Sequence, residues 1–239
     1  GRRHQIPTVY LMNSWDNPST KAVMLGVPDK LLVWGEQTKK HAIKFLGMTE
    51  ESVICAGAAQ FQIYARSPRA SRATYRESVE TDTSTTLICY AGSSRGLNEM
   101  EHLKLLDDAI TKTQVHCKVV YRPHPWKWIN PHERFFDDYE FRNIYLDPYS
   151  VESYRSSWNR ENLQIDLCDY EHTNILLRSI DGLISPLSTI LLEAAIFGLP
   201  IAVYRPEVAA EFGGDFSTDI HRIAFSEFYD IIQPVICEN

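Results

Sequence analysis

The part of the chain after residue 84 alternates short apolar runs with amphipathic stretches of about ten residues, and this rhythm constrains the fold more than any other feature. Runs of strand length lie at residues 85–90, 115–121, 143–146, 182–184 and 200–204. Helical periodicity lies between them, at residues 97–110, 170–179 and 187–197. Strands that alternate with helices in this way form βαβ units, so the sequence predicts an α/β fold with a Rossmann-like, doubly wound parallel sheet.

Residues 1–60 predict a second, smaller unit. Its apolar runs lie at residues 8–13, 30–34 and 52–56, with a helical stretch at residues 36–46. The order β-β-α-β is that of a partial α/β unit. Residues 61–84 are polar and basic, which is typical of a linker with one short helix and solvated arginines. The predicted organisation is therefore a partial N-terminal unit (1–60), a linker (61–84) and a C-terminal Rossmann-like domain (85–239).

The acidic charge balance argues against nucleic acid as a partner. The chain has 24 Lys+Arg and 31 Asp+Glu, a formal net charge of −7, which repels polyanions except at a local basic patch. Its 44% of hydrophobic residues is ordinary for a soluble globular protein. No apolar run reaches the roughly 20 residues of a membrane span. We expect a cytoplasmic protein, with peripheral attachment to the inner face of the membrane left open.

The cysteines and histidines do not predict a metal site. The five cysteines lie far apart without a C-x-x-C pair, which is typical of buried free thiols in a reducing compartment. They are Cys55, Cys89, Cys117, Cys168 and Cys237. The eight histidines include no H-E-x-x-H motif. We therefore expect chemistry that needs neither a metal ion nor another cofactor.

The turn before the helix at residues 187–197 carries the strongest signature of a ligand site. Ser185 is expected to cap this helix, with Pro186 at its first position and Gly198 as a left-handed stop. An otherwise apolar helix is typical of a buried one.

The polar side chains of that helix form a stripe. Ser188, Thr189 and Glu193 fall within one arc of roughly 140° at about 100° per residue. Such a stripe at a helix N-terminus suits a phosphate at Ser188 and Thr189 and sugar hydroxyls at Glu193. The alternative is that Ser188 and Thr189 only cap the helix while Glu193 faces solvent.

Two further strand ends carry candidate residues. Arg122 and His124 directly follow the strand at residues 115–121, and the prolines on either side of His124 restrict its backbone. An imidazole held in this way can donate to a phosphate or protonate a leaving group. The alternative is a structural or surface histidine.

The second is the turn that follows the strand at residues 85–90. It offers Gly92, Ser93, Ser94 and Arg95, whose small members let a ligand approach the backbone. No P-loop or G-x-G-x-x-G spacing supports this turn, so a plain connection is the alternative. A crowd of aromatic residues, from Trp126 to Tyr145, is either a stacking platform or ordinary packing.

These turns together resemble a known group of enzymes. The R-P-H-P turn, followed about sixty residues later by S-P-L-S-T-I-L-L-E-A-A-I-F-G-L-P, resembles the C-terminal, donor-binding half of GT-B glycosyltransferases. The resemblance is strongest to bacterial surface-polysaccharide enzymes with an HP motif, which include CDP-glycerol glycerophosphotransferases and CMP-sugar sialyl- or Kdo-transferases. The N-S-W-D-N segment, the V-W-G-E-Q-T-K-K-H-A helix and the C-A-G strand end resemble the tail of an N-terminal domain. The start at Gly1 also indicates a piece of a longer protein, so we expect a missing N-terminal domain or partner chain.

The resemblance implies roles for the candidate residues. His124, Ser188 and Thr189 would contact the donor phosphates, and Glu193 would hold the ribose. Residues 92–95 and Arg122 would line the same site. His124 would act as an electrophile or acid.

The predicted activity is transfer of a sugar or glycerol phosphate from a nucleotide donor, expected to be of the cytidine type, to a glycan or lipid-linked acceptor. Asp16 is the one N-terminal carboxylate that we consider as a base. A sugar-nucleotide epimerase of the non-hydrolysing type is an alternative, although that group usually has Ser-Gly-Gly where this chain has Ser185-Pro186-Leu187. A non-catalytic nucleotide-binding or partner module is the other.

Overall fold

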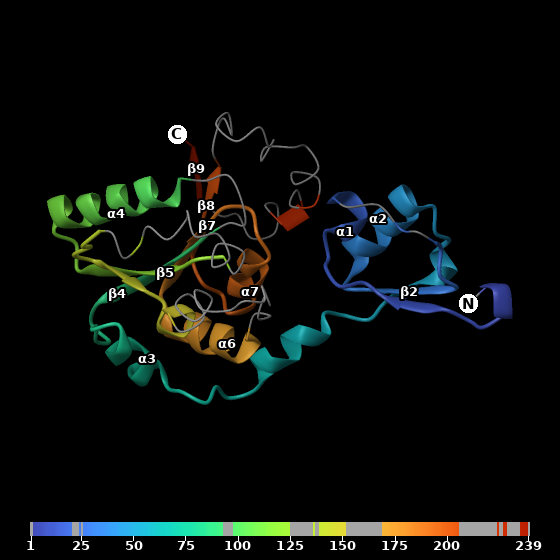
Figure 1. The fold of residues 1–239 in the computed structure, drawn as a ribbon, viewed down its shortest axis with the longest axis horizontal. Coiled ribbons are helices and arrows are strands. Elements are labelled where there is room, and N and C mark those ends of the chain that lie inside the picture. Colours follow the sequence, from blue (N-terminus) through green and yellow to red (C-terminus); the bar gives the residue numbers. More distant parts are fainter. Residues whose placement is uncertain are drawn as a thin grey trace, which may run out of the picture. The chain divides into compact units, whose positions relative to one another are not determined.

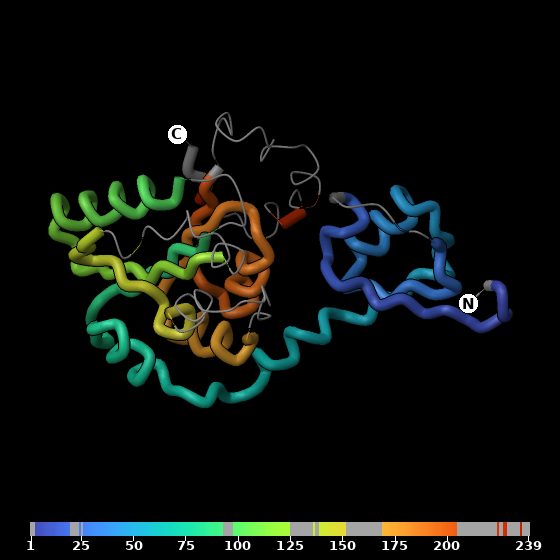
Figure 2. Tube along the Cα trace, in the orientation of Figure 1, coloured from blue at the N-terminus to red at the C-terminus, as the bar shows by residue number. Residues whose placement is uncertain are grey.

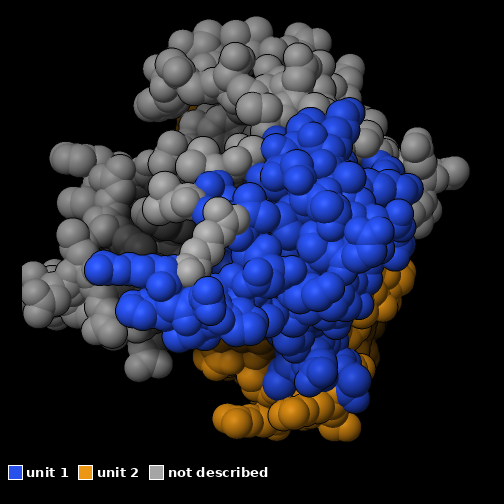
Figure 3. All heavy atoms as spheres, turned by 90° about the vertical axis from the view of Figure 1, so that its right-hand side faces the viewer, with its two compact units in different colours: residues 1–65, 216–233 blue, residues 66–215, 234–239 orange. Residues whose placement is uncertain are grey.

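The computed structural model divides into two compact units, which Figure 3 colours separately: residues 1–65 with 216–233, and residues 66–215 with 234–239. The residues whose structure is described are 2–20, 24, 26–92, 98–124, 136, 139–151, 169–205, 224, 227–228 and 235–238. The division into residues 1–60, 61–84 and 85–239 stays a prediction. In the described part of the chain, no helix is long and apolar enough to cross a membrane.

Unit 1 is built on a three-stranded parallel sheet in the order β1-β2-β3. Its strands are β1 (Val9–Leu11), β2 (Lys30–Val33) and β3 (Val53–Cys55). Its helices are α1 (Asn17–Thr20), α2 (Glu36–Leu46) and the 3₁₀ turns η1 (Arg2–His4), η2 (Glu50–Ser52) and η3 (Ala59–Ala65). Because α1 lies between β1 and β2, the predicted order β-β-α-β is wrong. A four-residue helix is too short to show a periodicity, yet parallel neighbours need such a crossover.

Figure 1 shows α1 and α2 on one face of this sheet. Six buried side chains form the core between them, namely Met12, Leu31, Val33, Ala42, Met48 and Val53. The helix α2 ends at Gly47, whose φ of 66° lies in the left-handed region that glycine adopts without strain. The apolar spacing of the sequence therefore determines which face of α2 is buried.

Unit 2 contains a six-stranded, all-parallel sheet in the order β6-β5-β4-β7-β8-β9. Its strands are β4 (Thr86–Ala91), β5 (Cys117–Arg122), β6 (Ile144–Leu146), β7 (Gly182–Ser185), β8 (Ile201–Arg205) and β9 (Val235–Glu238). The predicted α/β class and the doubly wound parallel sheet are confirmed. The strand β9 was not predicted, because a short run after Pro234 gives little signal.

Helices cover both faces of this sheet. In Figure 1, α4 (Glu99–Thr113) lies along one face, and α3 (Arg72–Ser78) and α6 (Tyr170–Ser179) lie along the other. On the α4 face, six buried residues form one cluster, namely Tyr90, Leu103, Ile110, Val119, Tyr121 and Ile144. The helix α4 extends beyond the predicted end at residue 110, into a polar last turn that lacks the apolar period.

Arg76 contradicts the prediction of a solvated arginine face in the linker. It lies on α3, which runs beside α6 (Figure 2), and only 1% of its surface is exposed. Its guanidinium donates to the carbonyls of Ser179 (2.9 Å) and Thr85 (2.7 Å) and to Oδ2 of Asp181 (2.5 Å). A buried charge has to be paired and hydrogen-bonded, and these acceptors come from two separate segments, residues 179–181 and Thr85. The sequence could not show this convergence.

The cysteines agree with the prediction only in part. Cys55, Cys89 and Cys117 are free thiols, but Cys55 is exposed, so burial was wrongly predicted there. It ends β3, where its sulfur donates to a Glu36 carboxylate oxygen at 3.2 Å. Cys168 and the side chain of Cys237 lie outside the described residues.

Candidate functional site

The strand order of unit 2 places a reversal between β4 and β7. From β4 the chain adds β5 and β6 on one side, and then returns to add β7, β8 and β9 on the other. In open parallel sheets, ligands bind at the carboxyl ends of the strands where the order reverses. Gly92 follows β4, and Ser185 is the last residue of the neighbouring β7. The carboxyl ends of β4, β5 and β7 therefore form the candidate site.

Arg122 and His124 lie at the carboxyl end of β5, as predicted. Nη2 of Arg122 donates to the hydroxyl of Thr173 on α6 at 2.8 Å. The carbonyl of Arg122 accepts the Gly92 N–H at 2.9 Å, which joins the ends of β5 and β4. His124 is half-buried two residues further on. The structure thus brings Gly92, Arg122 and the start of the proline-framed turn to one edge.

The turn after β7 differs from its prediction. Ser185 is the fully buried last residue of the strand and not a helix cap, and α7 (Ile190–Ile196) begins three residues later than expected. Thr189 occupies the N-cap position without a side-chain hydrogen bond to the helix. The oxygens of the Ser185 and Ser188 hydroxyls lie 3.1 Å apart. The predicted stop at Gly198 is confirmed by its φ of 64°.

Glu193 is buried, with 7% of its surface exposed, so it does not face solvent as one of the two interpretations required. It lies in the first turn of α7, one turn after Thr189. Its backbone N–H donates to the Thr189 carbonyl at 3.3 Å. Because α7 begins at Ile190, Ser188 and Thr189 precede the helix, and Glu193 is the one member of the predicted stripe that lies on it. The role of these three residues as a ligand site stays a prediction.

Glu99 is a carboxylate at this edge that the sequence analysis missed. It is the first residue of α4 and is fully buried. The hydroxyl of Tyr121 donates to its Oε2 at 2.5 Å. A Cβ added to Gly92 would lie 2.9 Å from the carboxyl carbon of Glu99, so the carboxylate occupies the space beside that glycine. An acidic residue in a first helical turn is common on protein surfaces, and no sequence signal marked this one as buried.

A second polar contact lies beside it, between Tyr90 and His102. The oxygen of the Tyr90 hydroxyl is 2.7 Å from Nδ1 of His102 on α4. The imidazole packs edge-on against Tyr204 of β8 at a centroid distance of 4.4 Å. Burial raises the pKa of Tyr90 far above its ordinary value, and the Glu99 carboxylate adds to this shift. Tyr90 is therefore a neutral hydrogen-bonding group at physiological pH.

The end of β6 carries a buried carboxylate as well. Asp147 accepts hydrogen bonds from the hydroxyls of Tyr75 (2.9 Å) and Ser150 (2.9 Å). Burial, followed by the charge of Asp147, raises the pKa of Tyr75 well above its ordinary value. Tyr149, which comes next along this turn, stacks on His172 with ring centroids 4.0 Å apart. These groups hold α3, α6 and the end of β6 together.

Several predicted residues cannot be placed. Ser93, Ser94 and Arg95 lie outside the described residues, as do Trp126, Trp128 and Phe135. The described aromatic residues of that stretch pack among themselves, since Phe136 stacks on Tyr121 and on Phe141. This favours packing over a stacking platform for them.

Two further predictions concern Asp16 and metal ions, and the role of Asp16 as a base stays a prediction. The Asp16 carboxylate, in unit 1, accepts a hydrogen bond from the Ser14 hydroxyl. Among the described residues, no group of three His, Cys, Asp or Glu side chains is arranged to hold a metal ion. Independence from a metal stays a prediction.

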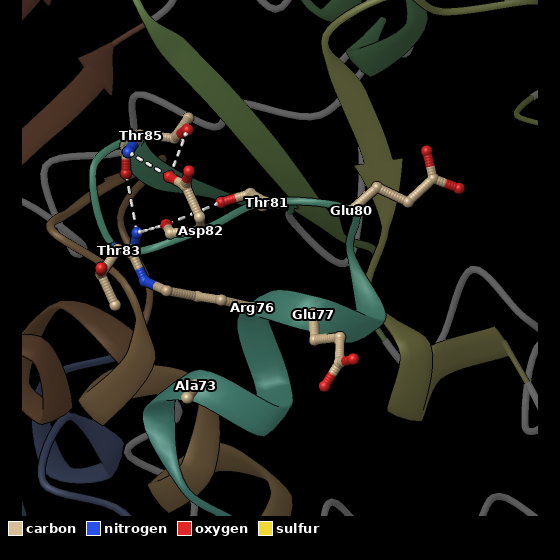
Figure 4. Close-up of a pocket in the computed structure, with 8 residues that line it drawn as sticks. All are labelled: Ala73, Arg76, Glu77, Glu80, Thr81, Asp82, Thr83 and Thr85. Atoms are coloured by element: carbon tan, nitrogen blue, oxygen red, sulfur yellow. Dashed lines mark hydrogen bonds between the residues drawn. The ribbon is translucent and has the colours of Figure 1, made fainter.

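A polar hollow of about 530 Å³ lies elsewhere, beside α3 and the loop that precedes β4 (Figure 4). The Arg76 side chain reaches toward this loop, while Glu77 and Glu80 point away from the guanidinium. Oδ1 of Asp82 accepts hydrogen bonds from the amides and hydroxyls of Ser84 and Thr85. The hollow lies at the amino end of β4, opposite to the edge at which such sheets bind ligands.

Comparison with solved structures identifies the fold. S. aureus MnaA in complex with UDP is similar to this chain with a TM-score of 0.55 at 15% identity, over 85% of this chain and 52% of MnaA. The chain has a GT-B-like fold. A Listeria monocytogenes protein assigned to the UDP-N-acetylglucosamine 2-epimerases gives a TM-score of 0.49 at 13% identity, over 86% of this chain and 51% of its own. The wall teichoic acid polymerase TagF, as a variant soaked with CDPG, gives 0.41 at 18% identity, over 73% of this chain and 39% of TagF.

The chain thus spans about half, or less, of the length of these solved structures. No protein-family model and no curated protein matches the sequence. The likeness to MnaA establishes the α/β, GT-B-like architecture that the sequence predicted, and the activity is a separate question.

Proposed function

We propose that this chain is the nucleotide-donor-binding part of a glycosyltransferase-like enzyme of surface polysaccharide biosynthesis. The observation that carries the proposal is the reversal of strand order between β4 and β7, with polar residues at the adjoining strand ends. Arg122 ends β5 and His124 lies in the turn after it, and Ser188 and Glu193 come from the turn and helix after β7. The likeness to UDP-bound MnaA supports a nucleotide as the ligand.

In this proposal, the donor diphosphate binds at Arg122, His124 and the Ser188–Thr189 turn. A guanidinium and hydroxyl groups held in place before reaction stabilise the negative charge that develops on the leaving phosphate. His124 donates a hydrogen bond or a proton to that group. Glu193 accepts hydrogen bonds from the ribose hydroxyls. A glycan or lipid-linked acceptor receives the sugar or glycerol phosphate, and the expected base of the donor is cytosine.

A sugar-nucleotide epimerase is the second candidate, because the likeness to UDP-bound MnaA supports it as much as it supports a transferase. The two differ in their need for an acceptor. An epimerase changes the donor sugar by itself, whereas a transferase releases the nucleotide only when an acceptor is present. Product analysis by NMR, with and without a glycan acceptor, separates them. A chain that binds nucleotide but does neither is a non-catalytic module.

The first test is a thermal-shift panel of CMP, CDP, UDP, GDP and ADP, with and without Mg²⁺. A ligand at about 100 times its Kd stabilises the folded state by roughly 2.7 kcal/mol, which is readily detected. We expect stabilisation by a cytidine nucleotide without Mg²⁺, and loss of it in Glu193→Gln. The control is Glu101→Gln, an equal charge change on an exposed residue of α4. No shift with any nucleotide would contradict the proposal.

A further inference from the structure

Two side chains of α4 are held on the sheet by a pair of tyrosines. Tyr90 and Tyr121 are register partners on β4 and β5. The Tyr121 hydroxyl donates to Glu99 at 2.5 Å, and the Tyr90 hydroxyl lies 2.7 Å from His102, which is one turn further along α4. These two polar contacts between α4 and the sheet can form together only when the helix has one particular rotation about its axis and one position along β4 and β5. The hydrogen bond to a carboxylate is also stronger than one between neutral groups.

The Glu99 carboxylate also shapes the end of β4. An added Cβ at Gly92 would lie 2.9 Å from both Cδ and Oε1 of Glu99, a separation that real side chains do not reach. Gly92 in turn donates its N–H to the carbonyl of Arg122 at 2.9 Å. Because Arg122 follows Tyr121, the four residues close a ring that joins the carboxyl ends of β4 and β5.

We propose that Glu99 is a positioning residue of the nucleotide site, and that it acts through Gly92 and Tyr121 on the backbone of Arg122. The inference rests on the proposed function, because the site that it orders is the donor site. Glu99 is fully buried and is not itself a binding group. Its carboxylate fixes the distance between the carboxyl ends of β4 and β5. Arg122 and His124 lie at this end of β5, so their positions depend on that distance. Glu99 directly follows the cap Asn98, in the first turn of α4, where the helix dipole stabilises a carboxylate.

The test combines five variants with three measurements. The single variants are Glu99→Gln, Tyr121→Phe and Gly92→Ala, and the double variants are Gly92→Ala/Glu99→Ala and Glu99→Gln/Tyr121→Phe. The dissociation constant of CDP or UDP, whichever binds the parent, is measured by calorimetry, and unfolding by urea is measured in parallel. We expect at least a tenfold weaker affinity in Gly92→Ala. The double variant Gly92→Ala/Glu99→Ala should recover only part of this loss, because removal of the carboxylate opens the space that the added methyl needs but also removes the group that bonds to Tyr121.

Glu99→Gln keeps the side-chain volume but removes the charge, so its affinity should fall three- to tenfold. Tyr121→Phe should weaken affinity by a similar factor. The loss of affinity in the variant that carries both changes should be smaller than the product of the two single losses, because both changes break the same hydrogen bond. If Glu99→Gln and Tyr121→Phe lower stability while the nucleotide affinity stays that of the parent, Glu99 is only a structural residue and the proposal is overturned.

The third measurement, hydrogen exchange of the Gly92 amide, does not depend on nucleotide. The Gly92 amide, bonded to the Arg122 carbonyl, should exchange its hydrogen faster in Glu99→Gln than in the parent, and at the parental rate in Glu101→Gln. A parent protein that binds no nucleotide would contradict only the proposed function. The hydrogen-exchange rate of the Gly92 amide would still test whether Glu99 positions the two strand ends. An unchanged exchange rate of this amide in Glu99→Gln would overturn the positioning role.

Discussion

The guanidinium of Arg122 donates to the hydroxyl of Thr173 across 2.8 Å, which joins the carboxyl end of β5 to the first turn of α6. Thr173 is buried, and its hydroxyl also lies 3.3 Å from the carbonyl of Asp169, the cap of α6. The direction of a candidate phosphate-binding cation is thus fixed by a helix that enters the chain about fifty residues later. In a preorganised site, such contacts lower the cost of ordering the side chain when ligand binds.

Thr173→Val should therefore weaken nucleotide binding. The valine matches the shape of threonine but accepts no hydrogen bond, and the loss of one bond costs about 1 kcal/mol, or roughly fivefold in affinity. Calorimetric titration with the nucleotide that binds the parent measures the change. Thr173→Ser keeps the hydroxyl and should bind as the parent does; equal losses in both variants would show that packing, and not the bond to Arg122, matters.

Arg76→Leu should destabilise unit 2 strongly. It removes a buried guanidinium that pairs with the half-buried Asp181 and leaves the carbonyls of Ser179 and Thr85 without their donor. Each buried acceptor left without its donor costs about 1–3 kcal/mol in the free energy of unfolding, which urea denaturation measures. Arg69→Ala is the control, because Arg69 is exposed and only its backbone N–H bonds to Glu171. Its unfolding midpoint should match that of the parent.

Leu103→Ala should also destabilise unit 2, for a different reason. Leu103 is fully buried in the core between α4 and the sheet, and truncating a buried leucine costs about 2–5 kcal/mol. Leu105 is two residues away on the same helix and 62% exposed, so Leu105→Ala should change the free energy of unfolding by less than about 0.5 kcal/mol. Similar losses in the two variants would mean that α4 is rotated from the orientation described.

Asp82 should contribute to acid sensitivity. Hydrogen bonds from the Ser84 side chain, and from the Thr85 and Ser84 amides, lower its pKa from 3.8 to about 2. Since the folded pKa lies below the unfolded one, the stabilisation is present above pH 3.8 and is lost as the pH falls through 2. The difference in stability between the parent and Asp82→Asn should be constant at neutral pH and should shrink in this acidic window. Carboxyl NMR titration of Asp82 would contradict the prediction if it gave an ordinary pKa.

Asp181 should titrate in the same direction. Burial works to raise its pKa, but hydrogen bonds from the Leu87 N–H and two arginines outweigh burial and hold the pKa below its ordinary value. Its contribution to stability is therefore also present at neutral pH and is lost on acidification. Asp181→Asn should show a weaker loss of stability in acid than the parent, as measured by urea unfolding at a series of pH values.

The sequence by itself determined the class of fold and the location of the candidate site. Apolar runs with the length of strands, separated by helical periods, are produced by burial on both faces of a parallel sheet, so β4, β5, β7 and β8 could be recognised from local pattern. The order of these elements and the polar residues after β5 and β7 pointed to the carboxyl edge. Gly198 predicted the end of α7, because the residue that follows a helix often has a positive φ, which glycine adopts without strain.

Only the tertiary structure decided which polar residues are buried and with what they pair. Arg76 had the sequence context of a solvated linker, yet its acceptors are supplied by segments as far away as Asp181. Glu99 had the context of an ordinary first helical turn, yet it lies beside Gly92 and Tyr121. Periodicity reports how much apolar surface a segment buries, whereas the pairing of a buried charge depends on residues that meet only after the strands have taken their order in the sheet.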